Sequence, residues 1–187
     1  MIYILEDNTF DKLAWKGMNS STLDELYTFL EDKDYRVRTL SAQAIQMKYA
    51  EDDVFKKISK MLESKDDSKR EVGAYILGQL GTPKMPFAKD SFPLLESSLN
   101  DDNEEVLVAT ISAIGHLWEY TNYVEDKLFN KVKKFIAHKN REIRISSLMA
   151  LVSTNKEVVN MVNKLLQDKD KEVREWAEVA KEIIEDN

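Results

Sequence analysis

Apolar and polar residues follow one another along this chain with the period of an amphipathic α-helix, and one pattern recurs five times. In each copy an apolar helix end leads into a short polar turn and then into a second helix. The copies start at Leu30, Leu62, Leu99, Ile136 and Leu166, which are 32, 37, 37 and 30 residues apart. Such spacings are typical of stacked helical-pair repeats. Because one pair cannot bury its own apolar face, the pattern predicts an all-α solenoid.

The first helix of each pair carries apolar residues at the i, i+3, i+4, i+7 spacing of one helix face. Thr22 and Glu25 open the first of these helices as a capping box. We expect the apolar faces to form the core of each pair. Their residues are Leu23, Leu26, Tyr27 and Leu30; Val54, Ile58, Met61 and Leu62; Phe92, Leu95 and Leu99; Leu128, Val132, Phe135 and Ile136; and Val158, Val162, Leu165 and Leu166.

The second helix of each pair carries a small residue at one fixed position, which lets neighbouring helices approach closely. These residues are Ser41, Gly73, Thr110, Ser147 and Ala177. The repeat domain covers residues 21–187, with repeats at approximately 21–50, 51–81, 90–120, 123–153 and 155–185. Residues 1–20 do not match the repeat, and we expect them to form a capping segment. Its short helix has Phe10, Leu13 and Ala14 on one face and ends near Gly17.

Composition narrows the class of protein. The chain has 187 residues, of which 43% are hydrophobic, and a net charge of −7. The hydrophobic share is enough for a sizeable core, and the acidic surface repels phosphate backbones and favours basic protein partners. No stretch reaches the roughly 18 apolar residues of a membrane span, and the start lacks the features of a secretory signal. We therefore expect a cytoplasmic protein that binds neither nucleic acid nor membrane.

Candidate catalytic and metal-binding residues are few. The chain has no cysteine, and its two histidines, His116 and His138, are too far apart to share one helix. A metal site would therefore rest on two histidines and scattered carboxylates. The sequence also lacks a G-x-S-x-G elbow and a glycine-rich phosphate loop. It predicts a protein that is not an enzyme and has no metal or cofactor.

The second-helix segments resemble the HEAT family, in particular its phycobilisome-lyase-like branch, whose pattern is approximately V-R-x-x-A-A-x-A-L-G-x-L-G. The matching segments are Val37-RTLSAQAIQ, Arg70-EVGAYILGQLG, Val106-LVATISAIGHL, Ile143-RISSLMALV and Val173-REWAEVA. The resemblance covers residues 22–185 and implies a right-handed α-solenoid of about five HEAT-like pairs. Since the family includes lyases, nucleic-acid enzymes, adaptors and inhibitors, the resemblance does not fix the function.

The resemblance also implies a structural ladder between adjacent repeats. In it, an acidic or amide residue in the turn pairs with the arginine four positions later, through a bidentate guanidinium contact. The pairs are Asp34 and Arg38, Asp66 and Arg70, Asn140 and Arg144, and Asp170 and Arg174. The third repeat has Asn103 but carries Leu107 in place of the arginine. We therefore expect a looser or more apolar joint there.

The third and seventh positions of each second helix form an i, i+4 pair on a face that neither core requires. The pairs are Thr39/Gln43, Glu71/Tyr75, Val108/Ser112, Ile145/Met149 and Glu175/Val179, and the next turn adds Met47, Gln79, His116 and Ser153. The middle of this face is apolar, and contiguous exposed apolar residues usually mark an interface. The predicted partner-binding residues are Tyr75, Gln79, Val108, Ser112, His116, Ile145 and Met149, with Glu71 and Glu175 at the rim. A shift of the helical phase by one residue would bury them instead.

These observations predict a non-catalytic, protein-binding solenoid, either a dedicated inhibitor or immunity-type protein or an adaptor, that binds a basic partner on its inner face. One alternative is a bilin-lyase-like protein in which Tyr75, His116 and Trp118 line a slot for a linear tetrapyrrole. Another is a helical-repeat nucleic-acid-binding protein or DNA glycosylase. Its aromatic residues would be Trp118, Tyr120, Tyr123 and Trp176. The basic groove that such a protein needs is missing from the sequence.

Overall fold

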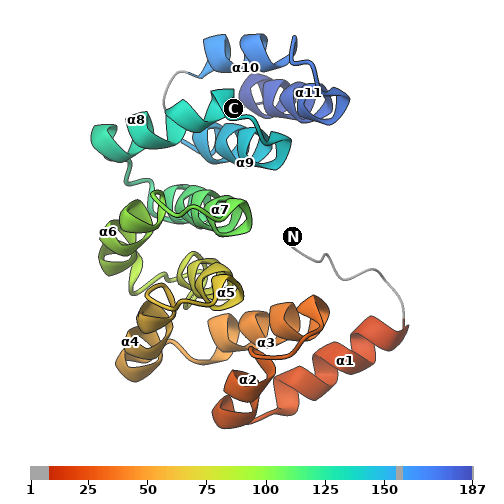
Figure 1. Ribbon diagram of the computed structural model, residues 1–187, viewed down its shortest axis with the longest axis vertical. Coiled ribbons are helices and arrows are strands. Elements are labelled where there is room, and N and C mark those ends of the chain that lie inside the picture. Colours follow the sequence, from red (N-terminus) through yellow and green to blue (C-terminus); the bar gives the residue numbers. More distant parts are fainter. Residues whose placement is uncertain (1–8, 155–157, 187) are drawn as a thin grey trace.

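The computed structural model describes residues 9–154 and 158–186, and all regular elements within these ranges are helices. They are α1 (Thr9–Ser20), α2 (Leu23–Phe29), α3 (Tyr35–Lys48), α4 (Asp52–Met61), α5 (Asp67–Leu77), α6 (Ala88–Ser98), α7 (Glu104–Thr121), α8 (Asp126–Lys134), the short 3-10 helix η1 (Phe135–Ala137), α9 (Arg141–Val152), α10 (Val159–Leu165) and α11 (Lys171–Glu185). After α1 the helices pair in chain order, from α2 with α3 to α10 with α11 (Figure 1). The predicted α-solenoid is confirmed.

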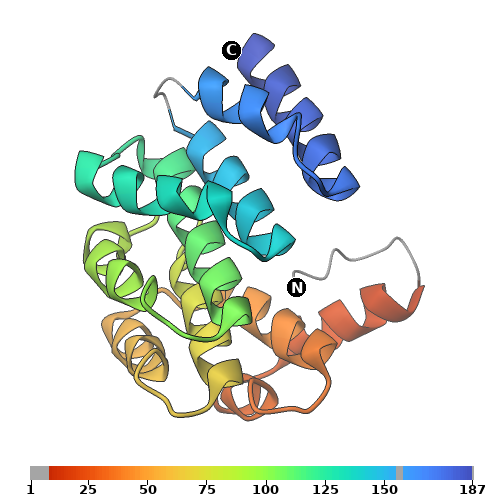
Figure 2. The same ribbon diagram turned by 45° about the horizontal axis from the view of Figure 1, so that its top comes forward.

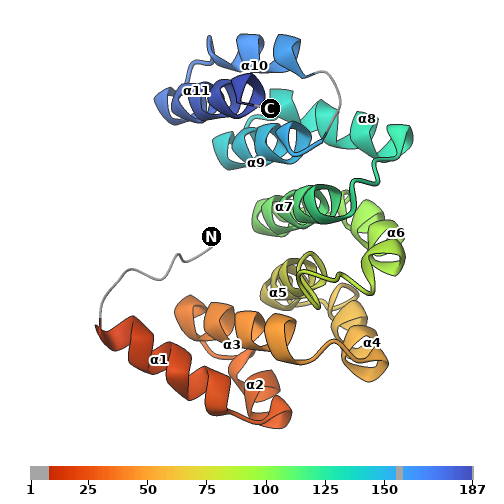
Figure 3. The same cartoon turned by 180° about the vertical axis from the view of Figure 1, so that it is seen from behind.

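The pairs stack into a curved array with two layers. The second helices of the pairs, α3, α5, α7, α9 and α11, line the inner side of the curve, and the first helices lie outside them (Figure 1). Figure 2 shows the second helices side by side after a turn, and Figure 3 shows the same layers from behind. None of the helices in the described ranges is long and apolar enough to cross a membrane.

The core lies between the two layers, and the predicted stripes point into it. One residue from each of four stripes illustrates this: Leu26, Ile58, Leu95 and Val132 have no exposed surface. The predicted small residues of the second helices are buried as well. At Gly73 an added Cβ would lie 2.9 Å from the Cβ of Met61 on α4, so the glycine permits this close approach.

Adjacent second helices also meet through glycine. A Cβ placed on Gly78, the C-cap of α5, would lie 2.5 Å from Cα of Ala113 on α7, and one on Gly115 of α7 would lie 2.8 Å from Cα of Ala150 on α9. Real Cβ atoms do not approach backbone atoms so closely, so these helices pack with their backbones almost in contact. The middle of the inner surface is therefore a closely packed layer of three helices, α5, α7 and α9.

The turns between first and second helices share one geometry. Each second helix is N-capped by a side chain of one position, namely Asp34, Asp66, Asn103, Asn140 and Asp170. In the last turn Oδ1 of Asp170 accepts from the N–H of Glu172 at 3.1 Å, and Oδ1 of Asp168 accepts from the N–H of Asp170 at 2.9 Å. These bonds satisfy backbone N–H groups that have no partner within a helix.

The capping helix differs from the prediction. Helix α1 does not end near Gly17 but continues to Ser20. There the hydroxyl of Ser20 donates to the carbonyl of Lys16, one turn earlier, at 2.9 Å. Leu13 is 64% exposed, whereas Met18 packs against the core and its sulfur accepts from the hydroxyl of Ser41 at 3.5 Å. A glycine inside a helix weakens it without ending it when the flanking residues favour the helix. The side chain of Phe10 and residues 1–8 lie outside the described part of the chain.

Candidate binding surface

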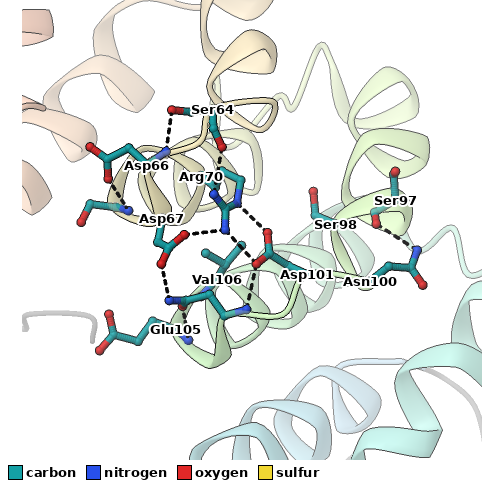
Figure 4. A network of polar contacts seen from close by, with 12 residues as sticks. Ser64, Asp66, Asp67, Arg70, Ser97, Ser98, Asn100, Asp101, Glu105 and Val106 are labelled. Carbon is teal, nitrogen blue, oxygen red and sulfur yellow. Dashed lines mark hydrogen bonds and ion pairs between the residues drawn. The ribbon is translucent and has the colours of Figure 1, made fainter.

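The inner surface is fixed by an arginine clamp at the joint between the second and third repeats. Nε and Nη2 of Arg70 donate to the two carboxylate oxygens of Asp101 at 2.6 and 3.0 Å, and Nη1 donates to the carbonyl of Ser64 at 2.8 Å (Figure 4). Nη2 also reaches Asp67 of its own repeat at 2.6 Å. The bidentate contact lowers the pKa of Asp101. One side chain thus ties its own turn to the following repeat.

Arg144 forms the same clamp between the fourth and fifth repeats. Its Nε and Nη2 donate to Asp168 at 2.9 and 2.8 Å, and its Nη1 donates to the carbonyl of His138 at 2.8 Å. Only 4% of the Arg144 side chain is exposed. Burial acts to raise the pKa of Asp168. The hydrogen bonds from Arg144 and from the N–H of Asp170, together with the positive charges of Arg144 and Lys169, outweigh burial, so the pKa is lowered.

Arg70 and Arg144 thus each bind a carboxylate of the neighbouring repeat, but these carboxylates, Asp101 and Asp168, are not among the residues of the predicted ladder. The arginines do not pair with the residues four positions earlier, because those side chains cap the second helices. Instead, Arg70 and Arg144 bind Asp101 and Asp168, which lie two positions before the capping residue of the next repeat. Arg38 and Arg174 donate to carbonyls of their own turns: Nη1 of Arg38 to the carbonyl of Asp32 at 2.9 Å, and Nη1 of Arg174 to the carbonyl of Asp168 at 2.7 Å. At the position that corresponds to Asp101 and Asp168, the second repeat carries Ser64. That residue gives Arg38 no carboxylate to bind.

The capping residues make contacts of their own. Asp34 pairs with Arg36 rather than Arg38, and hydrogen bonds from the Arg36 side chain and backbone lower the pKa of Asp34 to about 2. At the third joint, Leu107 is buried, yet Nδ2 of Asn140 donates to Glu104 across that joint at 2.7 Å. The joint between the third and fourth repeats is thus apolar at Leu107, and the hydrogen bond between Asn140 and Glu104 still crosses it.

Four predicted partner-binding residues come together on the inner surface. They line a small pocket between α3, α5 and α7, whose residues are Thr39, Ala42, Glu71, Val72, Tyr75, Val108, Ala109 and Ser112. Tyr75 and Val108 are half-buried and pack against the core, so each leaves part of its apolar surface open. On α5 and α7 these two positions are therefore not fully buried. This cluster is called the apolar pocket below.

Tyr75 contacts two glutamines of α3. Nε2 of Gln46 donates to the Tyr75 carbonyl at 2.8 Å, and Nε2 of Gln43 approaches the Tyr75 hydroxyl at 3.4 Å. Burial raises the pKa of Tyr75, and side-chain hydrogen bonds with Gln43 and Gln79 oppose the shift. The phenol is therefore neutral at physiological pH, and predicted residue Gln79 lies beside it.

A second depression adjoins the apolar pocket on the side of the helix N-termini. It is lined by Tyr35, Arg38, Thr39, Glu71, Val72 and Glu105, three of which also line the apolar pocket. Glu105 points away from the Arg70 clamp (Figure 4). Glu105 is not among the partner-binding residues predicted from the sequence. Its position one turn before Val108 on the same helix could have indicated it. We call this cluster the acidic depression.

The predicted surface differs from the structure at its α9 end, near the fifth repeat. Ile145 is only 8% exposed and belongs to the core. It follows Arg144, which reaches Asp168 before α11, so it lies at the joint between α9 and α11. Met149 is half-buried, and Trp176 and Val179 on α11 are 39% and 40% exposed.

The remaining predicted residues lie at the rims. His116 is half-buried with its Nδ1 3.8 Å from Glu119, and burial lowers its pKa while Glu119 acts to raise it. Glu175 is exposed and pairs with Lys171 at 2.7 Å. Of the aromatic residues considered for the alternatives, Trp118 is buried and tilted against Phe129, outside the apolar pocket that holds Tyr75.

Candidate metal ligands do not gather in the part of the chain that the structure describes, where no group of three or more His, Asp or Glu side chains could hold an ion. The apolar pocket and the acidic depression together present apolar side chains, hydroxyl groups and carboxylates.

No family model matches the chain. The chain is 27% identical over 160 residues to Protein YibA of Escherichia coli strain K12, an alignment that covers 84% of this chain and 56% of YibA. The chain therefore spans about half the length of this curated relative. The X-ray structure of E. coli YibA matches with a TM-score of 0.85 at 22% identity and covers 99% of this chain and 67% of that one.

A designed armadillo repeat protein in complex with the peptide (KR)4 is also similar in structure. Its TM-score is 0.55 at 14% identity, with 93% of this chain and 91% of that chain covered. Together with the arrangement of the helices, these likenesses establish a helical-repeat solenoid.

Proposed function

We propose that this chain is a non-catalytic protein-binding solenoid that docks a partner on its inner surface. The observation that carries the proposal is the apolar pocket, where Tyr75 and Val108 from adjacent second helices leave apolar surface open beside the carboxylate of Glu71. Apolar patches with a polar rim are typical of protein interfaces. Gly78 packs against Ala113, the residue that follows the pocket residue Ser112, so the two helices that carry most of the pocket are held close together beside it.

Within this function, we propose an inhibitor or immunity-type role, with a general adaptor as the close alternative. The repeats are proposed to be HEAT-like, of the phycobilisome-lyase-like branch, and the protein to be cytoplasmic. The net charge of −7 favours a partner with a basic surface and speeds its association. The designed armadillo repeat protein in complex with (KR)4 supports the proposal to the extent that a solenoid of this fold accommodates a basic peptide.

The alternatives have less support. A bilin-lyase-like site needs Trp118 beside Tyr75 in one slot, and Trp118 is instead buried near α8. A nucleic-acid site needs a basic groove, and the recurring arginines Arg70 and Arg144 are engaged with Asp101 and Asp168. Tyr120 and Tyr123 are exposed, but they lie at the end of α7 and in the following loop rather than in the apolar pocket.

The test is to co-express the chain with the protein encoded beside it and to measure growth and complex formation. An inhibitor should form a stable complex and rescue growth if that protein is toxic. An adaptor should form the complex without a growth effect. A visible absorption shift of an added linear tetrapyrrole, without any protein complex, would favour the lyase instead.

A further inference from the structure

We propose that the outward face of α11 is a second docking surface, on which Arg174 binds an aspartate or glutamate side chain of a protein partner. This inference goes beyond the proposed function, because the face lies at the end of the stack of repeats rather than on its inner side (Figure 1). It rests on the geometry of the two arginine clamps, which Arg174 repeats without the carboxylate.

Arg174 occupies the same position in its repeat as Arg70 and Arg144. In all three, Nη1 donates to the carbonyl of the residue six positions earlier, at 2.8 Å for Arg70, 2.8 Å for Arg144 and 2.7 Å for Arg174. In Arg70 and Arg144 this bond leaves Nε and Nη2 directed at the next repeat, where the two groups bind one carboxylate. The same bond therefore holds the guanidinium of Arg174 ready for a carboxylate.

The other edge of the Arg174 guanidinium has no acceptor among residues 9–154 and 158–186. Asp168 accepts from Arg174 only through its carbonyl, because its carboxylate is bound to Arg144. Arg174 is also half-buried, so its charge is partly withdrawn from water while Nε and Nη2 make no bond within the described ranges. Two parallel N–H donors in one plane match the two oxygens of a carboxylate.

Two exposed carboxylates set the charge around Arg174. Glu178 and Glu182 follow it by one and two helical turns, so they share its face of α11. In α5 and α7 the residues that correspond to Glu178 are Ala74 and Ile111, which have no exposed surface. A partner on the α11 face should therefore carry lysine or arginine beside its acidic side chain. A phosphate is disfavoured, because its larger negative charge would meet both glutamates.

A second copy of this chain does not fit the α11 face as the next repeat would. In the first repeat, α1 packs against α3 on the side away from α5, so it fills the place of a preceding second helix (Figure 1 and Figure 3). The α11 of another copy therefore cannot stack on α3 as one repeat stacks on the next. The site is assigned to a different protein.

The experiment pans a random dodecapeptide phage library on the full chain, on Arg174→Ala and on Tyr75→Ala. We expect peptides with an acidic residue beside lysine or arginine that bind the wild type and Tyr75→Ala but not Arg174→Ala. Failure to enrich such peptides on the wild type, or their retention by Arg174→Ala, would overturn the end site. Peptides lost only from Tyr75→Ala would also overturn it, while leaving the proposed function standing.

The best peptide is then synthesised and titrated by fluorescence anisotropy. We expect Arg174→Ala to weaken binding by about tenfold, because a charged hydrogen-bonded pair is lost. Lys133→Ala is the matched control, because it removes a positive charge from an exposed position on α8, outside the site. Equal losses for the two variants would mean that only overall charge matters and would overturn the site.

A charge reversal tests the contact independently of the stability of the alanine variant. Arg174→Glu should bind the peptide whose acidic residue is replaced by lysine more tightly than the wild type does, and no such gain would overturn the contact. Sedimentation velocity of the full chain and Arg174→Ala completes the test. Self-association that Arg174→Ala abolishes would assign the face to a second copy and overturn the assignment to a partner.

Discussion

At the scale of single residues, the two arginine clamps are ionic contacts that join neighbouring repeats. Each guanidinium binds one carboxylate of the next repeat and one or two carbonyls of its own turn, and both clamps are largely shielded from water. Removing one partner of such a buried pair leaves a charge without compensation.

We predict that Arg70→Ala and Arg144→Ala each lower the free energy of unfolding by about 1–3 kcal/mol. Arg38→Ala is the matched control and should cost less, because Arg38 bonds carbonyls without bridging to a carboxylate in the next repeat. Urea denaturation measures all three. Equal losses for the three variants would contradict the clamp.

The acid sensitivity of the first clamp follows from the lowered pKa of Asp101. A carboxylate with a lowered folded-state pKa contributes stability above its ordinary pKa of 3.8, and this contribution is lost as the pH falls through the folded-state value. We predict that Asp101→Asn destabilises the protein at pH 7 and that the difference from wild type shrinks below about pH 4. Denaturant titrations at several pH values test this. A difference that stays constant down to pH 2 would show that the ionised clamp contributes nothing.

At the scale of helices, glycine decides how closely the second helices stack. A Cβ at Gly78 would collide with the backbone of Ala113, whereas one at Gly17 in α1 would have no atom within 4 Å. We predict that Gly78→Ala destabilises the fold by about 1–3 kcal/mol. Gly17→Ala should stabilise it by up to about 1 kcal/mol through helix propensity. Thermal unfolding of both variants measures this, and changes of the same sign would refute the packing account.

Most of the helices and the core could be predicted from the sequence, because periodicity within one helix is a local property. Thr22 and Glu25 form the predicted capping box, with the Thr22 N–H donating to Glu25 at 2.8 Å. The partners of Arg70 and Arg144 could not be predicted, because repeats of unequal length hide which residue of the next turn lies opposite. The burial of Ile145 escaped prediction for the same reason.

At the scale of the whole molecule, the net charge of −7 and the engaged arginines oppose binding to a polyanion. We predict no measurable binding to generic duplex DNA at physiological salt. A mobility-shift titration at several salt concentrations tests this. A micromolar shift that weakens with salt would place the nucleic-acid alternative above the protein-binding one.

The central claim is that the inner surface between α3, α5 and α7 binds the partner, and affinity measured together with stability tests it most directly. The measurement uses the partner with Tyr75→Ala and Ser112→Arg, both in the apolar pocket, and with Asn130→Arg, an exposed control on α8. We predict a loss of about 2 kcal/mol or more in binding for Tyr75→Ala. Ser112→Arg should also bind more weakly, while its melting temperature and both properties of Asn130→Arg stay near those of wild type. Unchanged affinity in both pocket variants, with stability retained, would contradict the claim.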